Sequence, residues 1–96
     1  VNLGLTYDTS KLEMEKAMES LKEIIRENNS TEEKVDAVFT NWGDFSLGIL
    51  LIYYIKTGED IFNVQSRINL TILEKFNENN WNFAFPTQTI EISKEN

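Results

Sequence analysis

Apolar residues along the chain follow two periods, and these periods predict the order of the secondary-structure elements. Two-residue alternation and short apolar runs are typical of strands, which are predicted over residues 1–7, 35–41, 45–56, 81–85 and 88–93. Apolar residues that recur every three or four positions predict two amphipathic helices, over residues 10–28 and 60–77. The main stripe of the second helix comprises Ile61, Val64, Ile68, Ile72 and Phe76, widened by Phe62 and Leu73. The resulting order is β-α-β-β-α-β with one additional C-terminal strand.

Local signals mark where these elements begin and end. Ser10 and Glu13 have the spacing of a capping box at the start of the first helix. The segment Trp42-Gly43-Asp44 predicts a turn, because glycine accepts backbone angles that other residues avoid. Two helices that cover one face of a sheet give an α+β fold of the ferredoxin-like type. We therefore expect one domain over residues 1–93 and a short tail over residues 94–96.

The predicted strand over residues 45–56 differs from the others because apolar residues occupy both of its faces. One face carries Leu47, Ile49, Leu51, Tyr53 and Ile55, and the other carries Leu50, Ile52 and Tyr54. Such a strand needs cover on both sides. The second cover is either the C-terminal strand, folded back within the same chain, or another protein surface, and assembly is the favoured explanation.

Further apolar residues lie where a lone monomer does not need them. Leu70 points away from the main apolar stripe of the second helix, and Ile90 and Ile92 lie on the terminal strand. Trp42 and Trp81 lie at element ends, where a tryptophan serves either as the boundary of the core or as an interface anchor. We expect the anchor role for at least one of them. Contiguous exposed apolar surface usually marks a contact site, so these residues favour assembly.

The composition excludes several classes of functional site. The 96 residues include no cysteine and no histidine, which excludes disulfides, zinc–thiolate sites and cysteine nucleophiles and removes the commonest general base near neutral pH. Sixteen acidic residues against nine basic ones give a net charge of −7, which disfavours binding to nucleic-acid phosphates. We therefore expect no enzymatic activity, no metal, no cofactor and no nucleic-acid partner.

No segment of the sequence is predicted to cross a membrane. The longest nearly unbroken apolar run, residues 47–55, has nine residues, about half of the roughly 18–20 that a spanning helix needs. The first residues show no signal-peptide pattern. We expect a soluble domain cut from a longer chain, and a processed N-terminus is the alternative.

Four segments resemble, in order and spacing, the C-terminal α/β domain of small-conductance mechanosensitive channels, the MscS family. They are Asn2-Leu3-Gly4-Leu5-Thr6-Tyr7-Asp8-Thr9, Trp42-Gly43-Asp44-Phe45-Ser46 before an apolar strand that ends in Lys56-Thr57, Arg67-Ile68-Asn69-Leu70 followed by Ile72, and Phe83-Ala84-Phe85-Pro86-Thr87-Gln88-Thr89-Ile90. The resemblance runs from Asn2 to about Ile92, which is nearly the whole chain.

The resemblance implies a cytoplasmic vestibule domain of a mechanosensitive channel, at the cytoplasmic side of a bacterial inner membrane. Family members assemble as heptameric cages whose side portals pass ions and small solutes released on hypo-osmotic shock. Their transmembrane helices and middle β domain belong to other parts of the chain, so this domain alone is not expected to conduct. The apolar surplus and the resemblance together give ten candidate interface residues: Trp42, Asp44, Phe45, Leu50, Ile52, Tyr54, Leu70, Pro86, Ile90 and Ile92.

A regulatory domain of the same topology is the alternative function. Such a domain, for example an amino-acid-sensing module, would bind a small molecule between a helix and a strand at a subunit contact. The upstream sequence distinguishes the two: apolar helices followed by a β-rich segment favour the channel, and a catalytic domain favours the sensor.

Overall fold

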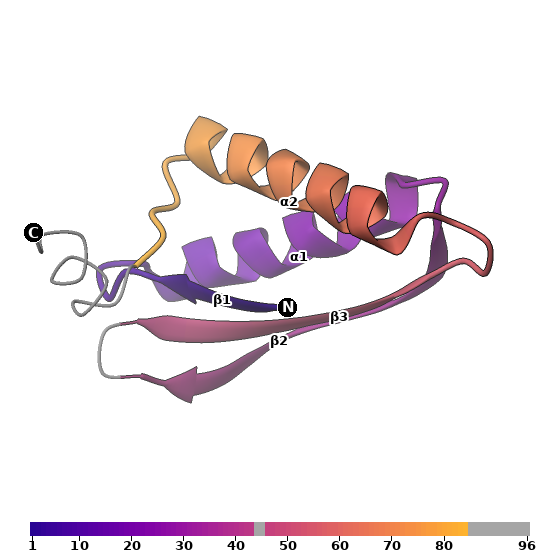
Figure 1. The fold of residues 1–96 in the computed structure, drawn as a ribbon. Helices are drawn as coiled ribbons and strands as arrows, with labels where there is room; N and C mark the ends of the chain where they lie inside the picture. The colour runs from indigo at the N-terminus through magenta and orange to yellow at the C-terminus, as the bar shows by residue number, and fades with distance from the viewer. Residues whose placement is uncertain (44–45, 85–96) are drawn as a thin grey trace, which may run out of the picture.

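The computed structural model describes residues 1–43 and 46–84 and has an α+β architecture of two layers. In chain order the elements are β1 (Asn2–Leu5), α1 (Lys11–Glu27), β2 (Thr31–Trp42), β3 (Leu47–Ile55) and α2 (Ile61–Glu78). Both helices lie on the same side of the sheet (Figure 1). The prediction of an α+β domain with two helices on one sheet face is therefore confirmed.

The three strands form one antiparallel sheet in the order β1-β3-β2. The central strand is β3, the strand with apolar residues on both faces. Leu3 pairs with Ile49 on one side of it, and Ala37 pairs with Leu51 on the other. As the central strand, β3 is paired along both of its edges over part of its length.

The strand predictions were wrong in three places. β1 is shorter than residues 1–7, and β2 begins at Thr31 rather than at residue 35. The charged residues 32–34 do not alternate, and a register shift between Thr31 and Val35 absorbs the extra residues of this irregular segment. The segment predicted as a strand over residues 81–85 forms an isolated antiparallel bridge, between Phe83 and Leu5, rather than a strand of its own.

Two backbone hydrogen bonds accompany that bridge. The Ala84 N–H donates to the Gly4 carbonyl at 2.9 Å, and the Thr6 N–H donates to the Asn82 carbonyl at 3.0 Å. The described sheet therefore has three strands, not the five that were predicted. The last predicted strand, residues 88–93, lies outside the described residues.

Both helices begin at the caps that the sequence indicates. The Glu13 N–H donates to Ser10 Oγ at 3.1 Å, and the Ser10 N–H donates to Glu13 Oε1 at 2.9 Å, which completes the predicted capping box. At the start of α2 the Asn63 N–H donates to Asp60 Oδ1 at 3.3 Å. Beyond its end Asn80 takes a left-handed conformation with φ of 60°, which asparagine tolerates better than most residues.

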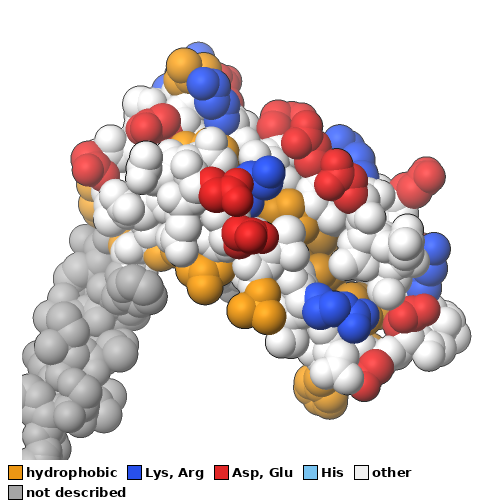
Figure 2. Space-filling model, turned by 90° about the horizontal axis from the view of Figure 1, so that it is seen from above, with side chains coloured by type: hydrophobic (Ala, Val, Ile, Leu, Met, Phe, Trp, Pro, Cys, Tyr) orange, Lys and Arg blue, Asp and Glu red, His pale blue; other side chains and the backbone are white. Residues whose placement is uncertain are grey.

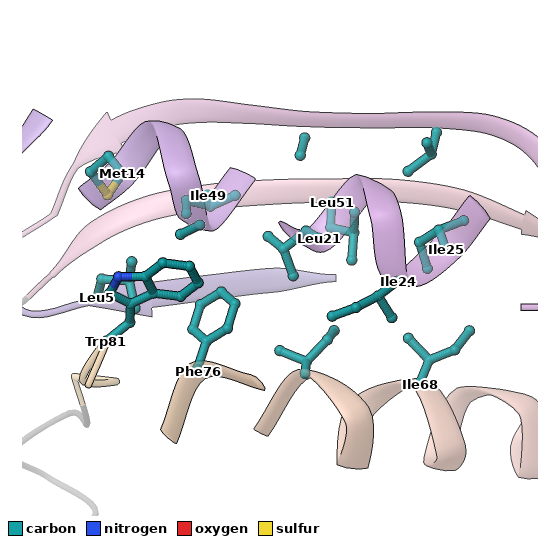
Figure 3. Packing of buried hydrophobic residues seen from close by; sticks show 14 of the residues in the cluster. Leu5, Met14, Leu21, Ile24, Ile25, Ile49, Leu51, Ile68, Phe76 and Trp81 are labelled. Atoms are coloured by element: carbon teal, nitrogen blue, oxygen red, sulfur yellow. The ribbon is translucent and has the colours of Figure 1, made fainter. Parts of the chain in front are cut away.

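The hydrophobic core fills the space between the helices and the sheet (Figure 3). From α2 it receives Val64, Ile68, Ile72 and Phe76, which confirms most of the predicted stripe. Phe76 meets Trp81 edge to face at 5.1 Å and stacks on Phe83 at 5.2 Å, so the segment after α2 closes one end of the core.

Three residues assigned to the α2 stripe are exposed instead, namely Ile61, Phe62 and Leu73. Leu73 follows Ile72 and therefore points about 100° around the helix from it, which takes its side chain off the buried face. The stripe is narrower than predicted, and part of the apolar surface of α2 faces outward.

Candidate interaction surfaces

The sheet has a second face that carries apolar side chains and lies away from the helices. We call the set Val38, Leu50, Ile52 and Tyr54 the outer sheet face. Val38, Ile52 and Tyr54 are 46%, 38% and 45% exposed, and Leu50 is half-buried. The described residues place no helix or strand over this face (Figure 1). The need for a second cover on β3, predicted from its pattern, is therefore not met within residues 1–43 and 46–84.

Strand register brings the residues of the outer sheet face together. Val38 lies opposite Leu50, and Asp36 lies opposite Ile52. Beside Tyr54, Lys34 Nζ lies 5.9 Å from the centre of the aromatic ring, within the range of a cation–π contact. At the other end of the face Gly4 pairs with Gly48, and the polar side chains of Ser46 and Asn41 lie over these two glycines. The face is thus an apolar strip with a charged margin.

A β-bulge separates Trp42 from this strip. Phe39 pairs with Ile49 and Asn41 pairs with Gly48, so β2 contains one extra residue between them. In a regular strand without the bulge, Trp42 would lie on the sheet face opposite to Phe39, because it follows Phe39 by three residues and side chains alternate along a strand. With it, the two rings lie on the same face with their centres 5.1 Å apart, and Trp42 is 75% exposed.

Trp42 and Phe39 border a hollow of about 410 Å³ between the end of β2 and the first turns of α1. Its apolar lining comes from Tyr7, Met14, Met18, Phe39, Trp42 and Leu47, and Lys11 and Glu15 contribute opposite charges. An exposed tryptophan is typical of contact surfaces. Trp42 is thus the exposed member of the tryptophan pair, whereas Trp81 is buried against Phe76 and belongs to the core.

The outward side of α2 is a third apolar surface. Leu70 is 62% exposed and Phe62 is 83% exposed. The exposure of Leu70 agrees with the prediction that it points away from the apolar stripe of α2. Figure 2, which views the molecule from the helix side, shows apolar side chains separated by acidic and basic ones. This surface is therefore less continuous than the outer sheet face.

The ten predicted interface residues do not form a single site. Leu50, Ile52 and Tyr54 lie together on the outer sheet face, while Trp42 and Leu70 lie on other surfaces. Five of the predicted residues lie outside the described residues: Asp44, Phe45, Pro86, Ile90 and Ile92. Val38 was missed as a member of the outer sheet face, although its alternation with Ala37 and Phe39 already places it opposite to them.

The described residues contain no group of three or more His, Cys, Asp or Glu side chains that could hold a metal ion. Within the same residues no helix is both long and apolar enough to cross a membrane.

The hydroxyl of Tyr53 is buried and has no hydrogen-bond partner among the described residues. Burial raises the pKa of this phenol above its ordinary value, because removal from water disfavours the anion. The arrangement offers surfaces for contact rather than a cluster of reactive groups.

Comparisons with known proteins point to one family. The family described as "Mechanosensitive ion channel MscS, C-terminal" matches residues 1–83. An uncharacterized MscS family protein of Aquifex aeolicus is 33% identical over 96 residues, which cover 96% of this chain and 26% of the relative. The small-conductance mechanosensitive channel MscMJ of Methanocaldococcus jannaschii is 34% identical over 98 residues, which cover 100% of this chain and 28% of the relative.

The large-conductance mechanosensitive channel MscMJLR of the same archaeon is 33% identical over 99 residues, which cover 97% of this chain and 27% of the relative. The chain thus spans about a quarter of the length of each of these relatives.

Proposed function

Because the chain belongs to the MscS family of mechanosensitive channels, we propose that it is the cytoplasmic vestibule domain of such a channel and that it holds the subunits together. Family membership favours this function over the amino-acid-sensing alternative. The observation that carries the proposal is the outer sheet face, whose apolar side chains have no cover among the described residues.

Burial of the outer sheet face would stabilise an assembly. Fully burying one large aliphatic or aromatic side chain contributes about 1.5–3 kcal/mol, and Val38, Ile52 and Tyr54 each retain more than a third of their exposure. Their partner is either the upstream middle β domain or a neighbouring subunit. In the proposed heptamer each subunit needs two different contact surfaces, because a ring is built from head-to-tail contacts.

The outer sheet face and the outward side of α2 lie on opposite sides of the two layers, which suits such a ring. In this arrangement Trp42, Asp44 and Phe45 contribute at the β2–β3 turn, and Leu70 contributes from α2. Pro86, Ile90 and Ile92 follow the described residues, and we propose that they also contribute to the subunit contacts. We also infer that the Phe83 segment completes a ferredoxin-like sheet beside β1, as its bridge to Leu5 suggests.

The channel itself requires segments other than these 96 residues. The relatives are about four times as long as this chain, so the proposed transmembrane helices and the gate belong to the remainder of such a protein. The net charge of −7 per chain would attract cations to portals between the subunits of a cytoplasmic cage. Ions and small solutes released on hypo-osmotic shock would pass these portals.

A charge on the outer sheet face tests the proposal. Ile52→Lys in the full-length channel is expected to reduce the assembled oligomer in crosslinking and native mass spectrometry, because a contact over this face would have to remove from water both the introduced ammonium group and the Asp36 carboxylate opposite it. In the 96-residue chain the same substitution should change the free energy of unfolding by less than about 1 kcal/mol, since Ile52 is already 38% exposed.

Asn29→Lys is the matched control, because it adds the same side chain at an exposed loop position away from the sheet. It should leave assembly and stability unchanged. A normal oligomer with Ile52→Lys, or a loss of folded structure in circular dichroism, would contradict the proposed role of this face.

A further inference from the structure

The ladder between β1 and β3 ends before β3 does. β1 pairs Asn2 with Leu50, and the next rung joins Val1 to Leu51. In that rung the Val1 amino group donates to the Leu51 carbonyl at 2.9 Å, and the Leu51 N–H donates to the Val1 carbonyl at 2.9 Å. β3 continues to Ile55. The described residues therefore place no strand beside residues 52–55 on this edge.

Two residues of this segment present their backbone groups to the open edge. In an antiparallel sheet a central strand directs the N–H and C=O of alternate residues to opposite neighbours. Leu51 directs both groups to Val1, whereas the Lys56 N–H donates to Ser30, on the β2 side. By this alternation Tyr53 and Ile55 direct their N–H and C=O groups to the open edge. Such an edge is a template for another strand.

A groove of about 450 Å³ follows the same edge. Its lining comprises Val1, residues 51–55 of β3, Glu32 of β2, and Ile61 and Gln65 from the first turns of α2. Ile61 is 55% exposed. The groove therefore has room for an added strand, with an apolar wall on the helix side and the open hydrogen-bonding groups of β3 at its base.

We propose that the open edge of β3 is the docking site for the residues that directly precede Val1 in the longer protein. The continuous ladder fixes their register: the first preceding residue lies opposite Ile52 and the second lies opposite Tyr53. The second residue then points to the helix side, toward Ile61, and we expect it to be apolar. The match to a C-terminal family domain and the roughly fourfold length of the relatives are consistent with such a segment.

This pairing would join the domain to the upstream part of the protein by a continuous strand. A strand held by a hydrogen-bond ladder fixes the orientation of the two parts, which a flexible linker does not. The inference rests on the ladder and the groove, and it holds whether or not the outer sheet face mediates assembly.

Amide hydrogen exchange, measured by NMR on three chains, tests the proposal. The first chain is the 96-residue protein, and the second carries Val-Lys-Val-Thr directly before Val1. The third carries Val-Lys-Pro-Thr, in which proline opposite Tyr53 lacks the N–H that the ladder needs. We expect exchange of the Tyr53 and Ile55 amides to be at least about tenfold slower in the second chain than in the other two.

The Leu51 amide, already bonded to Val1, serves as the internal reference. The slower exchange should be independent of protein concentration. Equal exchange rates in the valine and proline chains would overturn the proposal. Protection that rises with concentration in the 96-residue chain would also overturn it, since the edge would then pair with a second copy.

Discussion

The two faces of β3 carry similar side chains in different surroundings. Ile49 and Ile52 are both isoleucines of β3 and lie on opposite faces of the strand. Ile49 is 1% exposed, whereas Ile52 is 38% exposed. Figure 3 shows Ile49 and Leu51 within the core, between the sheet and the helices. Apolar residues on both faces of a strand indicate that both faces are buried in the complete protein. The position of the helices determines which of the two faces is buried within this chain.

The difference arises from chain connectivity. α1 connects β1 to β2, α2 follows β3, and both helices lie on the same side of the sheet (Figure 1). A helix can bury only one apolar stripe against the sheet, so both stripes cover the same face. The outer sheet face is left for the remainder of the protein or for another subunit.

The largest expected effect separates the two faces directly. Ile49→Ala should lower the free energy of unfolding by about 2–5 kcal/mol, because truncation leaves a cavity in the core. Ile52→Ala should lower it by less than about 1 kcal/mol, because its side chain already contacts water. Urea denaturation of the 96-residue chain measures both. Similar losses for the two variants would show that the outer sheet face is covered within the chain.

A second, smaller effect on the free energy of unfolding is expected at the start of α1, one of the two helices that bury the inner face of β3. Ser10→Ala removes the side chain that accepts from the Glu13 N–H, and we expect a loss of about 1 kcal/mol. Ser20→Ala, in the middle of α1, is the control and should be neutral or stabilising, because alanine has the higher helix propensity. A loss for Ser20→Ala as large as that for Ser10→Ala would argue against a specific capping effect.

The smallest effect is expected at the margin of the covered face, at Tyr53. Its buried hydroxyl has no partner among the described residues, so Tyr53→Phe should raise the free energy of unfolding at pH 7, by less than about 1 kcal/mol. Thermal unfolding of the two chains checks this sign. A clear destabilisation would show that the hydroxyl makes a hydrogen bond that the described residues do not contain.

The same variant has a predicted pH dependence. Burial raises the pKa of Tyr53 above the ordinary value of 10.0, so the folded state holds this proton more tightly than the unfolded state. The wild-type chain should therefore lose stability as pH rises above about 10, and Tyr53→Phe should lose less. Parallel slopes of the free energy of unfolding against pH for the two chains would contradict this.

Much of the fold could be predicted from the sequence because the signals for it are local. The capping box at Ser10 and Glu13 and the stripe from Val64 to Phe76 depend on residues within a few turns of each other. The exposed position of Leu70 follows from the same periodicity. The prediction of a strand over residues 81–85 was wrong because strand formation depends on a distant partner, and the described part of this segment forms one isolated bridge, from Phe83 to Leu5.

The helices, the central apolar strand, the lack of cysteine and histidine side chains and the resemblance to the MscS family, which the comparisons confirmed, could all be recognised in the sequence. Which apolar residues share a surface depends on the tertiary structure. The bulge between Phe39 and Asn41 moves Trp42 to the helix side, away from Ile52. Pairing register and layer order join residues far apart in the chain, and no local pattern encodes them.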